Sequence, residues 1–245
     1  MHTKKTIALV IPTLNEAENI ESLYNAISKV ALGLNRHTCK LIFIDDSTNE
    51  QTKQVIHTLA TEDLEIVYLE GPRQGFAQAI AYGLSVAKTH AEIIVTLDAD
   101  GSHNPEYIPA MVSVLEAGAD LVIGSRYCSG ASSRRKANQF LYSRSINALL
   151  RHATRSSITD YSSGYKAMRR EVLATLELDW NQTVGYVCQV EFALAVLKTG
   201  FCIQEIPIDF VDRTRGHSKF KFTHTLEATT KILTYSLRET IRRFW

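Results

Sequence analysis

Residues 92–100 read EIIVTLDAD, a mostly apolar run that ends in two aspartates one residue apart. Short β-branched, apolar runs of this kind are typical of a strand buried on both faces of a sheet. The run TIALVIP at residues 6–12 has the same character, and polar residues follow it. In open parallel sheets, ligands bind at the carboxyl ends of the strands. The two runs therefore predict a buried parallel sheet with a polar, ligand-binding edge.

The first half of the chain repeats this pattern. Further apolar runs predict strands at residues 41–44, 64–69 and 121–123. The stretches between them space their apolar residues three or four apart. They predict helices at residues 20–30, 51–60, 75–87 and 105–116. Five strands that alternate with four helices predict an α/β fold with a mostly parallel, doubly wound sheet.

The regular alternation ends after Arg126. Residues 128–138 are small, polar and basic, which predicts a mobile loop. Residues 202–211 alternate between apolar and polar. Pro207 inside this segment predicts an edge or bulged strand, because proline cannot donate a hydrogen bond to a neighbouring strand. The other expected elements are helices at residues 140–151 and 187–198 and a strand at residues 164–168.

The composition limits the class of protein. The chain has 245 residues, of which 45% are hydrophobic, so we expect one α/β domain with a large core. Its 27 Lys and Arg nearly balance its 26 Asp and Glu, and the net charge of +1 argues against a nucleic-acid binder. The cysteines form no close pair, and no stretch reads as a signal peptide or a membrane span. These features predict a reduced, cytoplasmic protein.

Acidic residues at two strand ends are the first candidates for chemistry. Asp98 and Asp100 follow the strand at 92–97, and carboxylates in this position suit Mg²⁺ or Mn²⁺ that bridges to phosphates. The alternative role of this pair is helix capping and solvation. Asp45 and Asp46 follow the strand at 41–44, where one carboxylate could accept hydrogen bonds from a nucleobase or ribose. Their alternative role is an N-cap of the next helix.

Two basic loops form the second set of candidates. They contain Arg126, Arg134, Arg135 and Lys136, and then Arg213, Arg215 and Lys219. Arg and Lys on loops near the carboxyl edge of a sheet suit the recognition of phosphate and diphosphate groups. The alternative is solvated surface charge, which is the usual role of a basic run.

Six motifs together resemble a known family. They are PTLNE (12–16), IDDST (44–48), DADGSHNP (98–105), GSRY (124–127), DYSSGYKAMRREVL (160–173) and IPIDFVDRTRGHSK (206–219). In this order, and across nearly the whole chain, they are similar to the family 2 glycosyltransferases. Within that family they resemble the polyprenyl-phosphate sugar synthases of the dolichyl-phosphate-mannose type. The last two motifs distinguish this branch from the wider family.

The resemblance implies an A-type glycosyltransferase fold and a set of donor-site residues. Pro12, Glu16 and Asp45 match residues that hold the nucleoside of a nucleotide sugar. Asp98 and Asp100 match the catalytic aspartates that engage Mg²⁺ or Mn²⁺ and the donor diphosphate.

The resemblance also implies cations for both substrates. Arg213 and Lys219 match the basic pair that closes over the donor diphosphate, and Arg126 matches a catalytic residue that meets the acceptor phosphate. Ser143 matches a second acceptor residue. The family usually carries an Arg four residues before this serine, and here that position is Gln139.

The C-terminal segment has its own pattern. Leu226, Leu233, Leu237, Ile241 and Phe244 recur at helical spacing, with arginines beside them. We expect a catalytic domain at residues 1–222 and an amphipathic helical tail at residues 223–245. Such a tail suits an anionic membrane surface, which would place the protein peripherally on the inner face of the cell membrane. The alternative is that the apolar stripe packs on the core.

These features predict an inverting glycosyltransferase that moves a sugar from GDP-mannose or a UDP-sugar to a polyprenyl phosphate. Mannose is favoured and glucose is the rival sugar. A hydroxyl acceptor is also consistent with the sequence; it needs a general base, and Glu191 is the candidate for that base. Two further functions stay open, a nucleotidyltransferase and a membrane-docked, nucleotide-binding subunit without turnover.

Overall fold

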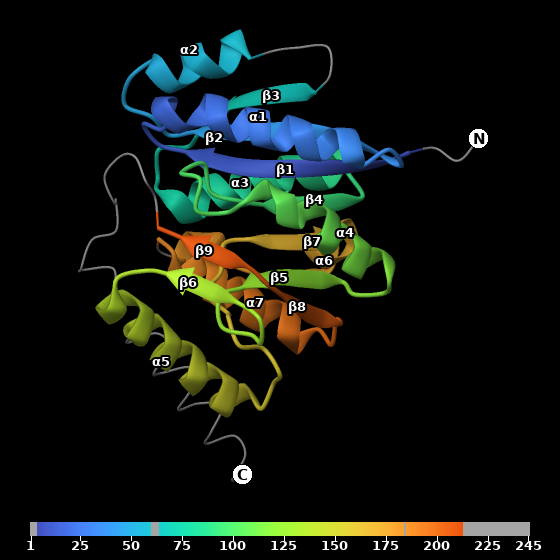
Figure 1. Cartoon of the computed structure of the whole chain (residues 1–245), viewed down its shortest axis with the longest axis vertical. Coiled ribbons are helices and arrows are strands. Elements are labelled where there is room, and N and C mark those ends of the chain that lie inside the picture. Colours follow the sequence, from blue (N-terminus) through green and yellow to red (C-terminus); the bar gives the residue numbers. More distant parts are fainter. Residues whose placement is uncertain (1–3, 60–63, 184, 213–245) are drawn as a thin grey trace.

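A seven-stranded sheet forms the centre of the computed structural model, which describes residues 4–59, 64–183 and 185–212 (Figure 1). The strand order is β3-β2-β1-β4-β7-β5-β8. These strands are β1 (Lys5–Thr13), β2 (His37–Asp45), β3 (Glu65–Glu70), β4 (Ile93–Thr96), β5 (Leu121–Ser125), β7 (Lys166–Arg169) and β8 (Ile203–Pro207). All neighbouring pairs in this sheet are parallel except the two that include β7. The predicted α/β class with a mostly parallel sheet is therefore confirmed.

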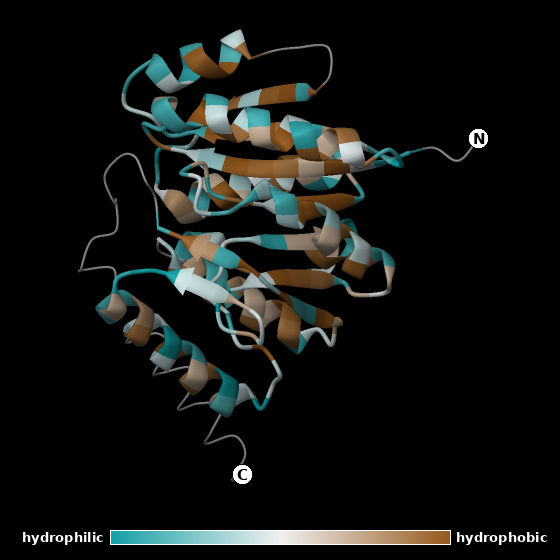
Figure 2. Ribbon diagram, viewed as in Figure 1, coloured by the Kyte–Doolittle hydropathy of each residue, from teal (hydrophilic) through white to brown (hydrophobic). Residues whose placement is uncertain are grey.

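Helices cover both faces of the sheet (Figure 1). They are α1 (Ala17–Gly33), α2 (Gln51–Thr58), α3 (Phe76–His90), α4 (Ile108–Glu116), α5 (Ala137–Thr154), α6 (Arg170–Thr175) and α7 (Val187–Lys198), with the 3-10 helices η1 (Pro105–Tyr107) and η2 (Trp180–Gln182). Leu9 in β1 packs in a core cluster with α1, α2 and α4, whereas its neighbour Val10 packs with α3, α6 and α7. Figure 2 shows that β1 is coloured as apolar along much of its length. This two-sided burial explains the nearly continuous apolar runs of the sequence.

β7 enters the sheet antiparallel, between β4 and β5. Ile94 pairs with Met168, and Val122 pairs with Ala167. After β5 the chain runs through β6 and α5 and returns at the carboxyl edge of the parallel strands. The strand is the one expected at residues 164–168, and its direction places residues 160–165 beside the end of β4.

A two-stranded parallel ribbon, β6 (Ser132–Arg134) with β9 (Asp209–Val211), corrects two expectations. The loop predicted at residues 128–138 contains β6 and the start of α5. The segment 202–211 reaches the sheet edge through β8, as expected, but it forms two strands. The break falls at Ile208, whose N–H donates to Ser125 O at 3.1 Å and whose carbonyl accepts from Ser132 N at 3.2 Å. The chain therefore changes partner from β5 to β6 at this residue.

The predicted tail at residues 223–245 lies outside the described residues, as do Arg213 and Lys219. Over residues 4–59, 64–183 and 185–212, no helix has both the length and the apolar character that crossing a bilayer requires.

Candidate active site

Asp45, at the end of β2, is the centre of a buried hydrogen-bonded group. Its Oδ1 accepts hydrogen bonds from Thr13 Oγ1 at 3.0 Å and from both N and Oγ of Ser47. Its Oδ2 accepts one from Tyr68 OH at 3.2 Å. Burial and the Asp45 charge raise the pKa of Tyr68, so its hydroxyl stays a donor. These contacts hold the Asp45 carboxylate in one orientation at the sheet edge.

The PTLNE segment is joined to the same group. Glu16 is 8% exposed, and its N–H donates to Thr52 Oγ1 at 3.2 Å. Ser47 Oγ lies 3.1 Å from the same hydroxyl. Pro12 lies in β1 beside the last residues of β2. The structure thus brings together Pro12, Glu16 and Asp45, the three residues expected at the nucleoside.

Residues 98–103, which we call the acidic turn, follow β4 and carry the paired aspartates. Ser102 N donates to Asp100 Oδ1 at 3.0 Å, and Gly101 has a φ of 78°, which glycine adopts at little cost. Asp98 N donates to His103 Nδ1 at 2.9 Å. The Asp98 side chain is 27% exposed and Asp100 is 9% exposed. The turn therefore holds two carboxylates close together at the sheet edge.

The donor chemistry of the acidic turn fits a hard divalent cation. Mg²⁺ prefers oxygen ligands and usually keeps several waters, with one or two carboxylates and substrate phosphates as its other ligands. Within the part of the chain that the structure describes, no group of three or more His, Cys, Asp or Glu side chains is placed to hold a metal ion. Asp98 and Asp100 would therefore supply the described protein ligands, and substrate phosphates and water would supply others.

His103 is a buried ring beside these carboxylates. Because its Nδ1 accepts the Asp98 N–H, the proton of the neutral ring is on Nε2. Burial lowers the pKa of His103 to about 4, with Arg126 adding to the effect and Asp100 opposing it. His103 had no predicted role, although it lies within the DADGSHNP motif, five residues after Asp98.

Arg126, which follows β5, forms a buried ion pair with Asp160. Arg126 Nε donates to Asp160 Oδ2 at 2.7 Å, and Nη2 donates to Oδ1 at 2.8 Å. Burial alone would raise the pKa of Asp160, but the Arg126 charge and hydrogen bonds lower it overall. The sequence pointed to Arg126 and missed Asp160, because the two lie 34 positions apart and meet only through the return of the chain into β7.

Ser162 joins Arg126 to Ser143 of α5. Its Oγ accepts from Arg126 Nη2 at 2.8 Å and from Asn147 Nδ2 at 2.9 Å, and it lies 3.4 Å from Ser143 Oγ. The two residues expected at the acceptor phosphate therefore meet at one hydroxyl. Gln139, on the same helix, is exposed.

Aromatic rings alternate with arginines near this ion pair. The Arg126 guanidinium lies 5.3 Å from the Tyr127 ring centroid and 5.4 Å from that of Phe210. Arg135 lies 5.4 Å from the same Phe210 centroid. Phe210 also meets His103 edge to face, with centroids 6.0 Å apart. Through Phe210, these contacts connect Arg126 and Arg135 to the acidic turn.

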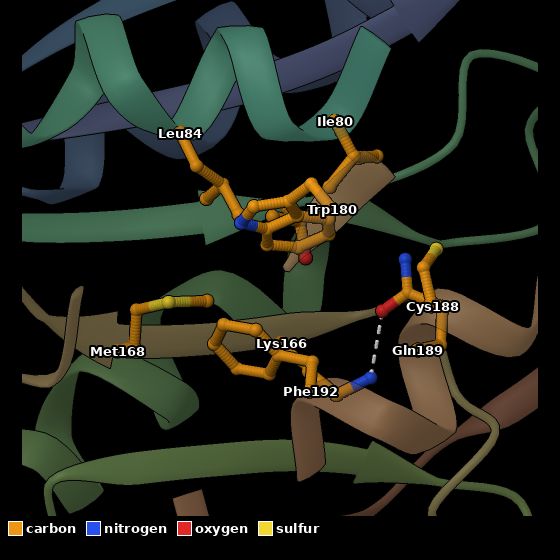
Figure 3. Close-up of a pocket in the computed structure, with 9 residues that line it drawn as sticks. Ile80, Leu84, Lys166, Met168, Trp180, Cys188, Gln189 and Phe192 are labelled. Carbon is orange, nitrogen blue, oxygen red and sulfur yellow. Dashed lines mark hydrogen bonds between the residues drawn. The ribbon is translucent and has the colours of Figure 1, made fainter. Parts of the chain in front are cut away.

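Glu191, the candidate base for a hydroxyl acceptor, lies on α7. It lies two positions from Gln189 on α7, or about 200° around the helix. Gln189 faces Lys166 and accepts from its Nζ at 2.8 Å (Figure 3). Glu191 instead accepts a hydrogen bond from Thr183 Oγ1 and lines a surface pocket of about 490 Å³. Gln189, on the same helix, lies near the acidic turn, since a Cβ on Gly164 would lie 3.6 Å from Gln189 Nε2 and 3.7 Å from Asp98 Oδ1.

Lys166 is a fully buried amine on β7. Besides Gln189, its Nζ also donates to Ser163 O. The cavity shown in Figure 3 has a volume of about 10 Å³, which is room for roughly one water. Burial lowers the pKa of Lys166 to about 7, although the Asp160 charge opposes the shift.

The fold is α/β, and polar and acidic residues follow the carboxyl ends of β1, β2 and β4. A family model described as Glycosyl transferase family 2 matches residues 8–176, a range that includes the acidic turn and the Arg126–Asp160 pair. The chain belongs to glycosyl transferase family 2.

Three sequence relatives are similar over most of this chain. Polyprenol monophosphomannose synthase of Mycolicibacterium smegmatis is 30% identical over 98% of this chain and 90% of that protein. Undecaprenyl-phosphate mannosyltransferase of Micrococcus luteus is 30% identical over 94% of each protein. Dolichol-phosphate mannosyltransferase of Pyrococcus furiosus is 29% identical over 88% of this chain and 59% of that protein.

The fold is also similar to solved structures of glucosyl-3-phosphoglycerate synthase from Mycobacterium tuberculosis. The complex of that enzyme with Mn²⁺, UDP and glucosyl-3-phosphoglycerate has a TM-score of 0.66 and 22% identity, over 96% of this chain and 80% of that chain. Its complex with Mg²⁺ and UDP has the same TM-score and identity, over 96% and 79%. The expected glycosyltransferase fold is thereby confirmed for the described residues.

Proposed function

We propose that the chain is an inverting, metal-dependent glycosyltransferase that moves mannose from GDP-mannose to a polyprenyl phosphate. UDP-glucose is the donor to test against GDP-mannose. The observation that carries the proposal is the joining of two groups through the Phe210 ring. Phe210 contacts His103 of the acidic turn and also Arg126, which shares Ser162 with Ser143. The three mannosyltransferase-type relatives support the choice of sugar and acceptor.

Asp98 and Asp100 would hold Mg²⁺ or Mn²⁺ against the donor diphosphate. The bound ion would supply electrostatic stabilisation of the leaving nucleoside diphosphate. Arg213 and Lys219, beyond the described residues, would add two cations to the same diphosphate. Metal-bound complexes of the structurally similar glucosyl-3-phosphoglycerate synthase support a divalent ion in this fold.

Pro12, Glu16 and Asp45 would hold the nucleoside. Asp45 is oriented by donors from Thr13, Ser47 and Tyr68, so it needs no rearrangement to accept a hydrogen bond from a base or ribose. Such fixed acceptors favour binding because little side-chain freedom is lost when the ligand arrives.

Arg126 and Ser143 would meet the acceptor phosphate. A phosphate monoester has its second pKa near 6, so it is largely dianionic at pH 7 and attacks without a strong general base. Arg126 remains charged throughout, because its ion pair with Asp160 raises its pKa against the opposing effect of burial.

The acceptor can be tested by offering two lipids that differ only in the phosphate. The purified chain, radiolabelled GDP-mannose and Mg²⁺ are incubated with polyprenyl phosphate or with the corresponding polyprenol. We expect label in the lipid only with the phosphate. Label in the polyprenol would overturn the phosphate acceptor and support a hydroxyl acceptor with Glu191 as the candidate base.

We further propose that residues 1–222 form the catalytic domain and that residues 223–245 form a helix lying on the membrane. A polyprenyl chain does not leave the bilayer readily, so the enzyme must reach it there. The cytoplasmic face of the cell membrane is the proposed location, because nucleotide sugars and anionic headgroups meet there.

A further inference from the structure

The Asp98 amide lies at the point where β4 ceases to pair with β1. Leu97 N still donates to Val10 O, at 3.2 Å. The next amide, Asp98 N, donates instead to His103 Nδ1 at 2.9 Å. A buried amide must find an acceptor or it destabilises the fold. Here His103, the last residue of the acidic turn, supplies that acceptor and so joins the end of the turn to its first residue, Asp98.

The His103 ring is fixed on several sides. It stacks on Tyr165, with centroids 5.0 Å apart and planes at 17°, and it meets the edge of Phe210. Tyr165 OH donates to Asn104 O at 2.9 Å, so one tyrosine holds both the ring and the residue after it. A Cβ on Gly164 would lie 3.4 Å from His103 Cε1, which leaves little room beside the ring.

The two carboxylates lie beside this ring and its neighbour in sequence. His103 Nδ1 lies 3.9 Å from Asp98 Oδ2. Ser102, its neighbour in sequence, donates its N–H to Asp100 Oδ1. Two adjacent residues therefore hold the acidic turn. His103 is bonded to the backbone of Asp98, and Ser102 is bonded to the side chain of Asp100.

We infer that His103 is a positioning residue of the metal site. Its Nδ1 acceptor fixes the backbone of Asp98 and so fixes where that carboxylate stands relative to Asp100. The inference rests on the proposed function, because it takes Asp98 and Asp100 as the metal ligands. Partners that orient metal ligands in this way typically contribute 10–100-fold to metal affinity.

Two matched variants separate the acceptor from the ring. His103→Leu and His103→Asn have the same branched skeleton and lose the same stacking on Tyr165. Only Asn keeps an acceptor atom, Oδ1, at the same number of bonds from Cα as Nδ1. Asn also buries an extra amide donor, so H103N should be no more stable than H103L. A purely structural role therefore predicts that H103N binds metal no better than H103L.

The readout is Mn²⁺ binding, measured from the electron paramagnetic resonance signal of free Mn²⁺ in the presence of GDP and, in parallel, UDP. We expect H103L to raise the Kd for Mn²⁺ by about 10-fold or more, and H103N to recover most of the wild-type affinity. Equal affinity in all three proteins, or equal loss in both variants, would overturn the role of His103 and leave the proposed function standing. A wild-type chain that binds no Mn²⁺ with either nucleotide would overturn the metal site and this inference together.

A measurement on the unmodified chain keeps the inference testable if H103L does not fold. The ¹⁵N chemical shifts of the His103 ring distinguish the two neutral tautomers. We expect the Nε2-protonated tautomer between pH 6 and pH 8, because Nδ1 accepts the Asp98 N–H. A ring that carries its proton on Nδ1 cannot accept that bond, and this result would contradict the inference.

Discussion

In the proposed mechanism, Asp100 is a negative ligand of the metal ion that offsets the charge of the donor diphosphate. Asp100→Asn keeps an oxygen that can accept from Ser102 N, so the acidic turn and the fold should survive. It removes a negative ligand from the metal. We expect turnover to fall by at least ~100-fold, because a metal ion contributes several kcal/mol of charge stabilisation. Steady-state rates and circular dichroism check this. An Asn variant as active as the wild type, or full activity in excess chelator, would remove the metal assignment.

Lys166 gives a pH dependence with a definite sign. Its pKa in the folded chain is about 7, whereas an unfolded lysine titrates near 10.4. Between these values the unfolded chain binds more protons than the folded one, so the free energy of unfolding should rise with pH over this window. Lys166→Met should flatten that rise. Urea unfolding at pH 7, 8 and 9 measures the slope, with the exposed Lys88→Met as the control.

The same unfolding measurements would also show whether this prediction for Lys166 is wrong. If the slopes of wild type, Lys88→Met and Lys166→Met coincide, the buried amine does not titrate as described.

Single residues divide into those the sequence could reveal and those it could not. Asp98, Asp100 and Asp45 were predictable because each follows an apolar strand, and parallel strands end at a common edge. His103 and Asp160 were not, because their roles depend on atoms brought from distant segments. His103 needs Tyr165 and Phe210 around it.

At the scale of elements, the edge strand β8 holds residues 159–160 in place through one carboxylate. Glu205 accepts from the N–H groups of Thr159 and Asp160, each at 2.8 Å. Glu205→Ala would leave both donors without this acceptor and should lower the free energy of unfolding by ~2–4 kcal/mol. Chemical denaturation measures the change. Gln204→Ala, on the same strand and exposed, should change it by less than ~0.5 kcal/mol.

A small effect of Glu205→Ala, comparable to that of Gln204→Ala, would mean that β8 does not brace the 159–160 segment. The same segment carries Asp160, so a large effect should be accompanied by weaker use of the lipid phosphate.

Some elements could be predicted from the local sequence pattern alone. The helix expected at residues 187–198 has these bounds in the structure, since its apolar spacing is local. The ribbon of β6 and β9 could not be predicted, because Ser132–Arg134 and Asp209–Val211 lie far apart in sequence and each is only three residues long. The direction of β7 was equally invisible, because the apolar pattern of a short strand does not encode its orientation.

At the scale of the whole molecule, the proposed membrane helix at residues 223–245 would determine how the enzyme reaches its acceptor. We predict that a chain ending at Thr225 stays folded but no longer floats with anionic vesicles. Its lost residues include Arg238, Arg242 and Arg243. Each arginine near an anionic surface contributes about 1 kcal/mol. Vesicle flotation and circular dichroism measure the two properties. Unfolding of the truncated chain would show that the tail packs on the core, and a full-length chain that never floats would end the membrane proposal.

The two parts of the chain differ in how much of their structure could be predicted from the sequence. The part of the chain from β1 to the acidic turn follows the regular strand and helix alternation and was predictable nearly element by element. The part after Arg126 depends on a chain reversal, a ribbon and a buried ion pair, so the sequence predicted its motifs and some of its elements but not how they are arranged.

The most direct test of the central claim is transfer of labelled sugar into lipid. The purified chain is offered radiolabelled GDP-mannose or UDP-glucose with polyprenyl phosphate and Mg²⁺, and the organic extract is counted. We predict mannose in the extract, dependent on both Mg²⁺ and the lipid phosphate, with inverted anomeric configuration. No labelled lipid from either donor, or label that persists in excess chelator, would contradict the proposed activity.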